Sequence, residues 1–171
     1  MATADKILLG YGVVSVNGTP IGLTRGGSVF TVEREYCSIE ADGDKGFVKG
    51  RIVIDSENAK LTVNALELFT AADMTKYYPA MTVTPTPAQT PTTDVMKSTL
   101  VIASGNHNDV VWVGKTKDGK AVTITVEDAI NMGNLEWTLE DKNEVVPSLE
   151  FTATYDEATR DTAPWSVVFA R

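Results

Sequence analysis

Period-two alternation of apolar and polar side chains near the C-terminus is the feature that most constrains the fold of this chain. Apolar residues alternate with polar ones along two runs, Leu135–Leu139 and Leu149–Tyr155, which the acidic turn 141–144 separates. Such alternation is typical of strands with one face on a core and the other towards water. A charged turn then leads into a third apolar run, Trp165–Phe169. We therefore predict three strands here and a mainly β protein.

Strand and turn signals continue through the rest of the chain. Asn17–Gly18 and Asp118–Gly119 are typical of tight hairpin turns, because these residues tolerate the positive φ that such turns need. Polar composition predicts a loop at Glu40–Gly46, and three prolines among threonines predict an extended loop at 82–94. The remaining predicted strands are Ile7–Val16, Ile21–Leu23, Ser28–Tyr36, Phe47–Ser56, Ala59–Val63, Val95–Ala103, Asp109–Gly114 and Ala121–Glu127.

One helix is predicted between the strands. Asn64 can cap it, Glu67 lies at the capping-box position, and apolar residues follow at helical spacing: Ala65, Leu68, Phe69 and Ala72. We expect the helix to end before Tyr77. The predicted fold is an antiparallel β-sandwich or partial barrel with one flanking α-helix, in a single domain over residues 1–171 that includes the 82–94 loop.

Composition and charge limit the classes of function. The chain has 171 residues, of which 43% are hydrophobic and 22% charged, so it can bury a core. Its net charge of -8 argues against tight binding to nucleic-acid backbones, which normally requires a basic patch. The single cysteine and the lack of a long apolar run lead us to expect synthesis and folding in a cytoplasm, with no membrane partner.

No segment of the sequence carries a convincing active-site pattern. The acidic loop at Asp42 breaks the calcium-loop pattern, because the sixth and twelfth residues are Phe47 and Val53 instead of glycine and glutamate. His107 has no nucleophile-elbow pattern near it, and we expect it in an exposed turn. Cys37 has no partner cysteine and is expected to be half-buried. We therefore expect no enzymatic activity, no cofactor and no metal.

Two blocks of the sequence resemble the tail tube (major tail) proteins of long-tailed bacteriophages. The C-terminal block contains W-T-L-E at 137–140, S-L-E-F-T-A-T-Y-D at 148–156 and P-W-S-V-V-F at 164–169. The N-terminal block contains L-T-R-G-G at 23–27, a strand, an acidic loop and K-G at 49–50. Together they cover roughly two thirds of the chain, in the order that these proteins have.

The resemblance implies a structural protein of the virion. Proteins of this family assemble into hexameric rings that stack into a tube, and strands from all subunits complete one large barrel around a channel. DNA passes through the channel without specific binding during ejection. The resemblance also implies partners: further copies of the chain, a tail-tip initiator, a tape-measure protein and a terminator. An acidic chain is consistent with a lumen that repels DNA.

We expect the channel lining and the ring contacts to come from residues 28–56 and from the loops. The lumen-facing candidates are Thr31, Glu33, Glu35, Lys49, Arg51 and Asp55, which alternate with apolar residues. The candidates for contacts between rings are Glu40, Asp42, Asp44 and Lys45 in the acidic loop. The alternation alone favours an ordinary solvent face of a monomeric sandwich, and only the resemblance reverses this preference. A register error of one residue would also exchange the two faces.

Two other functions fit parts of the sequence. A monomeric β-sandwich that binds a carbohydrate or protein ligand, or decorates a virion, would need an exposed aromatic platform. Tyr77–Tyr78 with one of Trp112, Trp137 and Trp165 is the candidate platform, although the tryptophans alternate in phase with core residues. A small hydrolase is disfavoured, because no nucleophile and base are brought together in the sequence.

Overall fold

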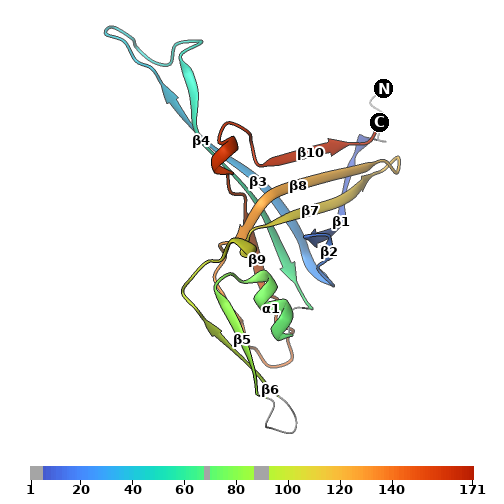
Figure 1. Cartoon of the computed structure of the whole chain (residues 1–171). Helices are drawn as coiled ribbons and strands as arrows, with labels where there is room; N and C mark the ends of the chain where they lie inside the picture. The colour runs from blue at the N-terminus through green and yellow to red at the C-terminus, as the bar shows by residue number, and fades with distance from the viewer. Residues whose placement is uncertain (1–5, 68–69, 87–92) are drawn as a thin grey trace.

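The computed structural model describes residues 6–67, 70–86 and 93–171, and these residues form a mainly β structure (Figure 1). The described part contains one α-helix. The elements in chain order are β1 (Leu8–Val16), β2 (Thr19–Pro20), β3 (Thr24–Ser38), β4 (Ile52–Ala65), α1 (Ala71–Tyr77), β5 (Met81–Thr86), β6 (Thr93–Ser98), β7 (Asn108–Thr116), β8 (Ala121–Asn131), β9 (Ser148–Thr152) and β10 (Trp165–Phe169).

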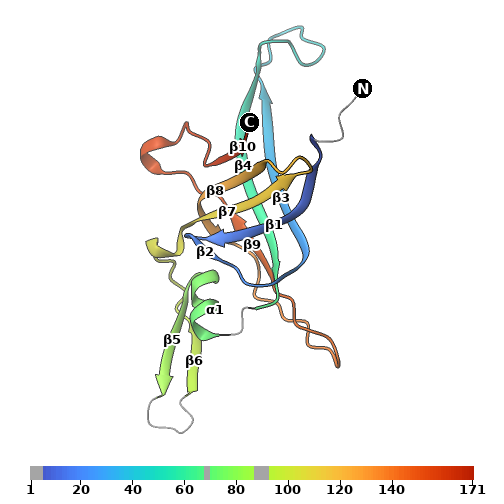
Figure 2. The same ribbon diagram turned by 90° about the vertical axis from the view of Figure 1, so that its right-hand side faces the viewer.

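Eight strands form one antiparallel sheet that folds into two layers (Figures 1 and 2). The first layer contains β2, β1, β7, β8 and β10 in that order, and the second contains β9, β4 and β3. Strand β8 joins them, because its first part pairs with β7 and β10 whereas Ile130 and Asn131 pair with β9. Asp128 has a φ of 45° between these parts, where the strand changes layer. This architecture confirms the predicted antiparallel sandwich with one helix, and the described strands do not close into a barrel.

The core lies between the two layers. Alternate residues of β4 are buried, with Leu61 and Val63 at 1% and 0% exposure, and they face the buried side chains of the first layer. Those side chains include Val14, Val16, Val110, Val122 and Val126. Burial of one face of each strand is the arrangement that period-two alternation predicts. Phe30 of β3 and Trp165 of β10 extend the core towards the sheet edges, with ring centroids 5.7 Å apart.

Trp112 packs on a pair of glycines in the first layer. Gly12 of β1 and Gly114 of β7 are directly opposite in the ladder, and the indole ring covers both. A Cβ atom added at either glycine would overlap the ring of Trp112. The two glycines therefore make room for a large aromatic side chain, which is a use of glycine within strands that pure alternation does not predict.

The predicted helix exists, but it begins later than expected. Strand β4 continues through Ala65, so Asn64 is part of a strand and does not cap a helix. The hydroxyl of Thr70 caps α1 instead by accepting a hydrogen bond from the Asp73 N–H at 3.1 Å. Pairing with β3 and β9 holds residues 60–65 extended, and these long-range bonds override the local helical pattern. The predicted helix residues Leu68 and Phe69 lie outside the described residues.

Several predicted strands are confirmed with changed bounds. The run Trp165–Phe169 is β10 as predicted, and Ser28–Tyr36 lies within the longer β3. The predicted strands Phe47–Ser56 and Ala59–Val63 are one continuous strand, β4, that starts only at Ile52. The Asn17–Gly18 turn is confirmed, with φ values of 47° and 74° that join β1 to β2.

Four predictions from local pattern are wrong in whole or in part. The run Leu135–Leu139 has the clearest alternation in the chain, yet it forms no ladder and lies in the connection between β8 and β9. Strands β5 and β6 form a separate hairpin from residues on both sides of the predicted 82–94 loop, of which residues 87–92 lie outside the described residues. The strand predicted at Val95–Ala103 ends at Ser98, and the residues Ile21–Leu23 after β2 form no strand.

Candidate assembly surface

The β3–β4 hairpin extends well beyond the two-layer body (Figures 1 and 2). We call residues 36–54, which comprise the ends of both strands and the loop between them, the arm. Within the arm both faces of the ladder carry apolar residues, because Tyr36 pairs with Ile54 and Cys37 pairs with Val53. Exposed fractions range from 46% to 79% among its large apolar side chains: Tyr36, Ile39, Phe47, Ile52, Val53 and Ile54. The body covers neither face of the arm.

A bulge marks the base of the arm. The ladder pairs Glu35 with Ser56 but the next residue, Tyr36, with Ile54, so Asp55 is an extra residue on β4. An extra residue bends a strand and increases its local twist. It also changes which alternate residues face each side of the ladder. The sequence prediction assumed unbroken alternation along this strand, and the bulge is where that assumption fails.

A polar cluster fixes the strands just below the bulge. The Glu57 carboxylate accepts hydrogen bonds from Trp165 Nε1 at 2.6 Å and from Arg34 Nε at 2.5 Å, and the Tyr155 hydroxyl donates to the Glu57 carbonyl at 3.2 Å. The bond from Trp165 and the bond and charge of Arg34 lower the pKa of Glu57 below its usual value. The cluster joins β3, β4 and β10, so it ties the base of the arm to both layers of the body.

The loop of the arm is ordered by contacts of its own. Asp44 accepts hydrogen bonds from the Ala41 N–H and from Arg51 Nη1, both at 2.8 Å. Asp44 is therefore a structural residue of the loop, whereas Glu40, Asp42 and Lys45 extend into solvent. All four predicted ring-contact candidates lie at the end of the arm furthest from the body. The loop runs from 39 to 51 and is longer than the predicted Glu40–Gly46.

Three of the predicted lumen residues share one surface. Thr31, Glu33 and Glu35 are exposed on the outer face of the second layer, whereas Phe30 and Val32 pack against the core. The other three lie elsewhere: Lys49 and Arg51 are in the arm loop, and Asp55 is the bulge residue. They were assigned to the same face because β4 was expected to begin at Phe47.

Two residues of this outer face were missed by the sequence prediction. The Lys60 ammonium lies 3.4 Å from a Glu33 carboxylate oxygen and 3.8 Å from one of Glu150, so it links β3, β4 and β9. We call the outer face of the second layer the acidic face, since it carries Glu33, Glu35 and Glu150 but only one lysine, Lys60. The alternation of Ser56, Asn58, Lys60 and Thr62 along β4 is the signal that could have found it.

Strand β3 forms one edge of the eight-stranded sheet. It pairs with β4 on one side, and on its other side no described strand is hydrogen-bonded to it. It is 15 residues long, so it presents a long row of backbone N–H and C=O groups on that side. Long exposed edges of this kind pair readily with another chain, and monomeric proteins usually shorten or cover them.

The structure places the residues considered for chemistry in two separate regions, the body and the arm. His107 is half-buried, not in an exposed turn, and its Nδ1 lies 3.1 Å from Thr154 Oγ1. That hydroxyl donates a hydrogen bond to the Asp128 carbonyl at 2.6 Å. Cys37 is exposed on the arm and not half-buried as expected. Within the described ranges, no group of three metal-ligating side chains comes together.

The aromatic platform of the alternative function is not present at the expected place. Tyr77 and Tyr78 are both buried beside α1, and burial raises the pKa of each hydroxyl. Trp112 is buried in the core, and Trp165 is half-buried against Glu57 and Phe30. Only Trp137 of the proposed set has a large exposed fraction, 41%.

Comparisons with known proteins do not assign the chain to a family. No family model matches it, and no curated protein sequence matches it significantly. Over the described residues, no helix has the length and hydropathy needed to cross a membrane.

Proposed function

We propose that this chain is the subunit of a phage tail tube, in which hexameric rings stack into a conduit for DNA ejection. The observation that carries the proposal is the arm, whose apolar side chains are exposed on both faces of an ordered hairpin. Exposed apolar surface of this extent marks an interaction site in a soluble protein. A partner that covers both faces of the arm accounts for its composition, and further copies of the chain are the partner that the resemblance implies.

The free edge of β3 supports assembly from identical subunits. Ring closure by strands of neighbouring copies removes exposed edges, which a single sandwich of this kind cannot do. Such contacts are heterologous, since the edge of one subunit meets a different surface of the next, and they close into a ring when the rotation between subunits allows it. The open sandwich of the monomer therefore fits a subunit that completes its sheets on assembly.

The acidic face is our candidate for the channel lining. It carries Thr31, Glu33 and Glu35 together with Lys60 and Glu150, so its side chains are polar and its net charge is negative. Repetition of this face around a ring gives a negative potential over the channel wall, which repels DNA phosphates. A wall without a basic patch lacks the charges that hold a nucleic-acid backbone. DNA could then slide through without binding.

Negative-stain electron microscopy of the concentrated protein tests the proposal directly. We expect rings or hollow tubes of uniform diameter, either from the protein alone or after addition of a tail-tip complex as initiator. A variant in which a short glycine-containing turn replaces residues 40–50 should keep its near-ultraviolet circular dichroism but form no tubes.

A stable monomer at all concentrations, with and without the initiator, would contradict the proposal. It would favour the monomeric binding or virion-decorating module instead. Size-exclusion chromatography with light scattering separates these outcomes, since rings, tubes and monomers differ greatly in mass.

A further inference from the structure

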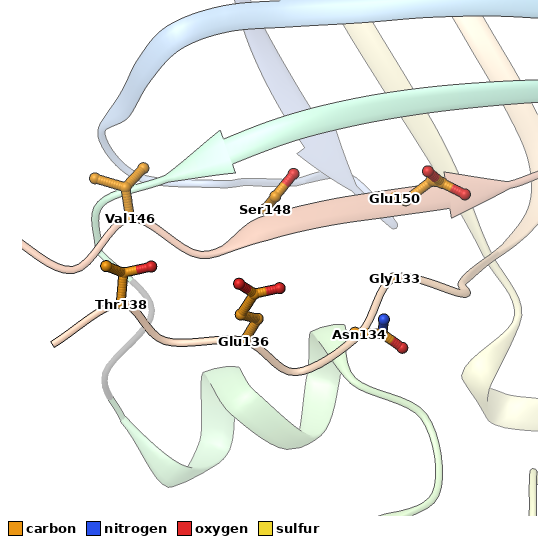
Figure 3. Close-up of a pocket in the computed structure, with 7 residues that line it drawn as sticks. All are labelled: Gly133, Asn134, Glu136, Thr138, Val146, Ser148 and Glu150. Atoms are coloured by element: carbon orange, nitrogen blue, oxygen red, sulfur yellow. The ribbon is translucent and has the colours of Figure 1, made fainter.

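A polar groove lies between strand β9 and the connection that precedes it, beside α1 (Figure 3). The segment Gly133–Thr138 runs beside Val146–Glu150 without joining it, and the space between them encloses about 380 Å³ (Figure 3). Its lining is Gly133, Asn134, Glu136, Thr138, Val146, Ser148 and Glu150. We propose that this groove receives the arm loop of a second copy of the chain, an inference that rests on the proposed function and names the contact between successive rings.

The side chain of Asn131 creates the groove. Its Oδ1 accepts hydrogen bonds from the Gly133 N–H at 2.9 Å and the Glu150 N–H at 3.0 Å, in the place of a backbone carbonyl. The bond from Met132 N–H to the Glu150 carbonyl is the last described backbone bond between the two segments. Beyond it they separate, because Asn131 Oδ1 binds the Glu150 N–H, which is the donor that the β8–β9 ladder would have used next.

The groove exposes a short free edge of β9. The backbone groups of Pro147 and Ala153 are hydrogen-bonded to β4. Those of Glu150 point to the other side, where its carbonyl accepts from the Met132 N–H and its N–H donates to Asn131 Oδ1. Backbone groups of a strand alternate in direction, so the N–H and C=O of Ser148 point into the groove. No described backbone hydrogen bond satisfies them there. An extended segment from another chain can bond to this edge, which is the mode of recognition called strand addition.

Charge favours the arm loop as the occupant. Residues 133–147 contain four acidic residues and one lysine, and no described ion pair involves Glu136. Residues 45–51 of the arm contain three cations and no acidic residue. Of these, Arg51 is bound to Asp44, whereas Lys45 and Lys49 take part in no described ion pair. The whole loop is neutral, since Glu40, Asp42 and Asp44 balance these cations, but its second half, 45–51, is a cationic segment that can approach an acidic groove without repulsion.

The arm loop also offers an apolar anchor. Phe47 lies between the two lysines with 79% of its surface exposed. Val146 is the apolar member of the groove lining. An aromatic side chain flanked by charges that match the groove is the usual composition of an interface centre with a polar rim.

The positions of the two surfaces favour stacking over dimerisation. The arm projects from the side of the body away from α1 in both views (Figures 1 and 2), whereas α1 lies beside the groove (Figure 3). A contact between two different surfaces is heterologous, and it gives an open, linear assembly when the rotation between copies does not close it into a ring. This is the contact that a tube needs along its axis, in addition to the contacts that close each ring.

Photo-crosslinking at the arm tests the proposal without requiring rings or tubes. The photo-reactive residue benzoylphenylalanine replaces Phe47, which preserves an aromatic side chain, and mass spectrometry maps the crosslinks between copies. We expect links to residues 133–150 of a second copy. The same residue in place of Phe169, an exposed aromatic outside the arm, is the matched control and should give no links to that segment.

Charge reversal then identifies the residues that carry the contact. Lys49→Glu and Glu136→Lys should each reduce the yield of crosslinked dimer about fivefold or more, and the double variant should restore it. Lys97→Glu makes the same charge change on exposed β6 outside the groove and should leave the yield unchanged. Links from position 47 only to other regions, no link at all, or no restoration in the double variant would overturn the proposal.

Electron microscopy of the wild-type protein separates this inference from the proposed function. If tubes form but position 47 does not crosslink to residues 133–150, the tube function is supported and the groove is not the stacking site. The link without rings or tubes would keep the groove as a self-association site and argue against the tube function. The absence of both the link and tubes would contradict both.

Discussion

The two halves of the β3–β4 ladder differ in environment although they belong to the same two strands. Next to the body, Phe30 pairs with Leu61, and one face of the ladder is buried. Within the arm, Tyr36 pairs with Ile54, and both residues are exposed. The residue types are similar in both halves. An apolar side chain of this ladder therefore stabilises the isolated chain only where a second layer covers it.

The boundary between the halves is built by specific residues. The bulge at Asp55 changes the register, and the cluster around Glu57 ties the strands to β10 directly below it. Beyond this point no first-layer strand lies over the ladder (Figure 2). The arm is thus held in position by the body while its own surface remains available.

The largest expected effect comes from deletion of a core side chain. Leu61→Ala should lower the free energy of unfolding by about 2–5 kcal/mol, because Leu61 is 1% exposed and its loss leaves a cavity. Ile54→Ala, an arm residue at 53% exposure, is the matched control on the same strand and should change the monomer by less than about 1 kcal/mol. Urea denaturation at low protein concentration measures both. Equal losses would mean that the arm is packed in the monomer after all.

A second prediction concerns the glycine pair under Trp112. Gly114→Ala should destabilise the body by about 1–3 kcal/mol, because the added Cβ overlaps the indole ring and forces it to move. Gly10→Ala on β1 has open space around the new methyl group and serves as the control. Thermal unfolding followed by Trp fluorescence should separate the two variants. A Gly114→Ala protein as stable as Gly10→Ala would show that Trp112 repacks freely.

The Glu57 cluster should make stability depend on pH. Because the pKa of Glu57 is lowered in the folded state, its contribution is present above its unfolded pKa of about 4.3 and is lost as pH falls through the folded pKa. Glu57→Gln should cost about 1–2 kcal/mol at pH 7, with the difference from wild type shrinking towards pH 3. Urea unfolding across this pH range tests it. A difference that stays constant with pH would contradict the role of the carboxylate charge.

The smallest effect on the monomer is expected at the tip of the arm. Phe47→Ser should change the unfolding free energy by less than about 0.5 kcal/mol, because Phe47 contacts solvent over most of its surface. The same substitution should strongly reduce tube formation in electron microscopy if the arm is an assembly surface. A marked loss of monomer stability would instead place Phe47 in the packing of the isolated chain.

The sequence predicts the elements whose local signals and long-range partners agree. Strand β10 and the Asn17–Gly18 turn were found at the correct positions, because alternation, turn residues and sheet pairing favour the same structure there. The residues Thr31, Glu33 and Glu35 were assigned to one exposed face for the same reason. Prediction failed where these signals conflict. At residues 64–65 the helical spacing predicted a helix, but pairing with neighbouring strands holds them in β4.

The candidate surfaces were only partly accessible to sequence reasoning. The polarity of the loop at 40–46 correctly indicated a loop, but the exposure of Tyr36 and Ile54 was not foreseen. Alternation shows which residues share a face of a strand, yet it cannot show whether another layer covers that face. The placement of Lys49 and Arg51 failed because the start of β4 depends on loop contacts such as the one between Asp44 and Arg51.

The sequence alone determined that this chain is built from strands, where most strands lie and which residues of each share a face. These properties follow from backbone geometry and side-chain polarity, which act over a few residues. Long-range contacts, by contrast, leave Leu135–Leu139 outside any strand, although its alternation is the clearest in the chain. A strand needs a hydrogen-bonded neighbour, and the side chain of Asn131 ends the neighbouring ladder just before this segment. The same non-local rule left the arm exposed, because packing requires a second surface that the local pattern does not specify.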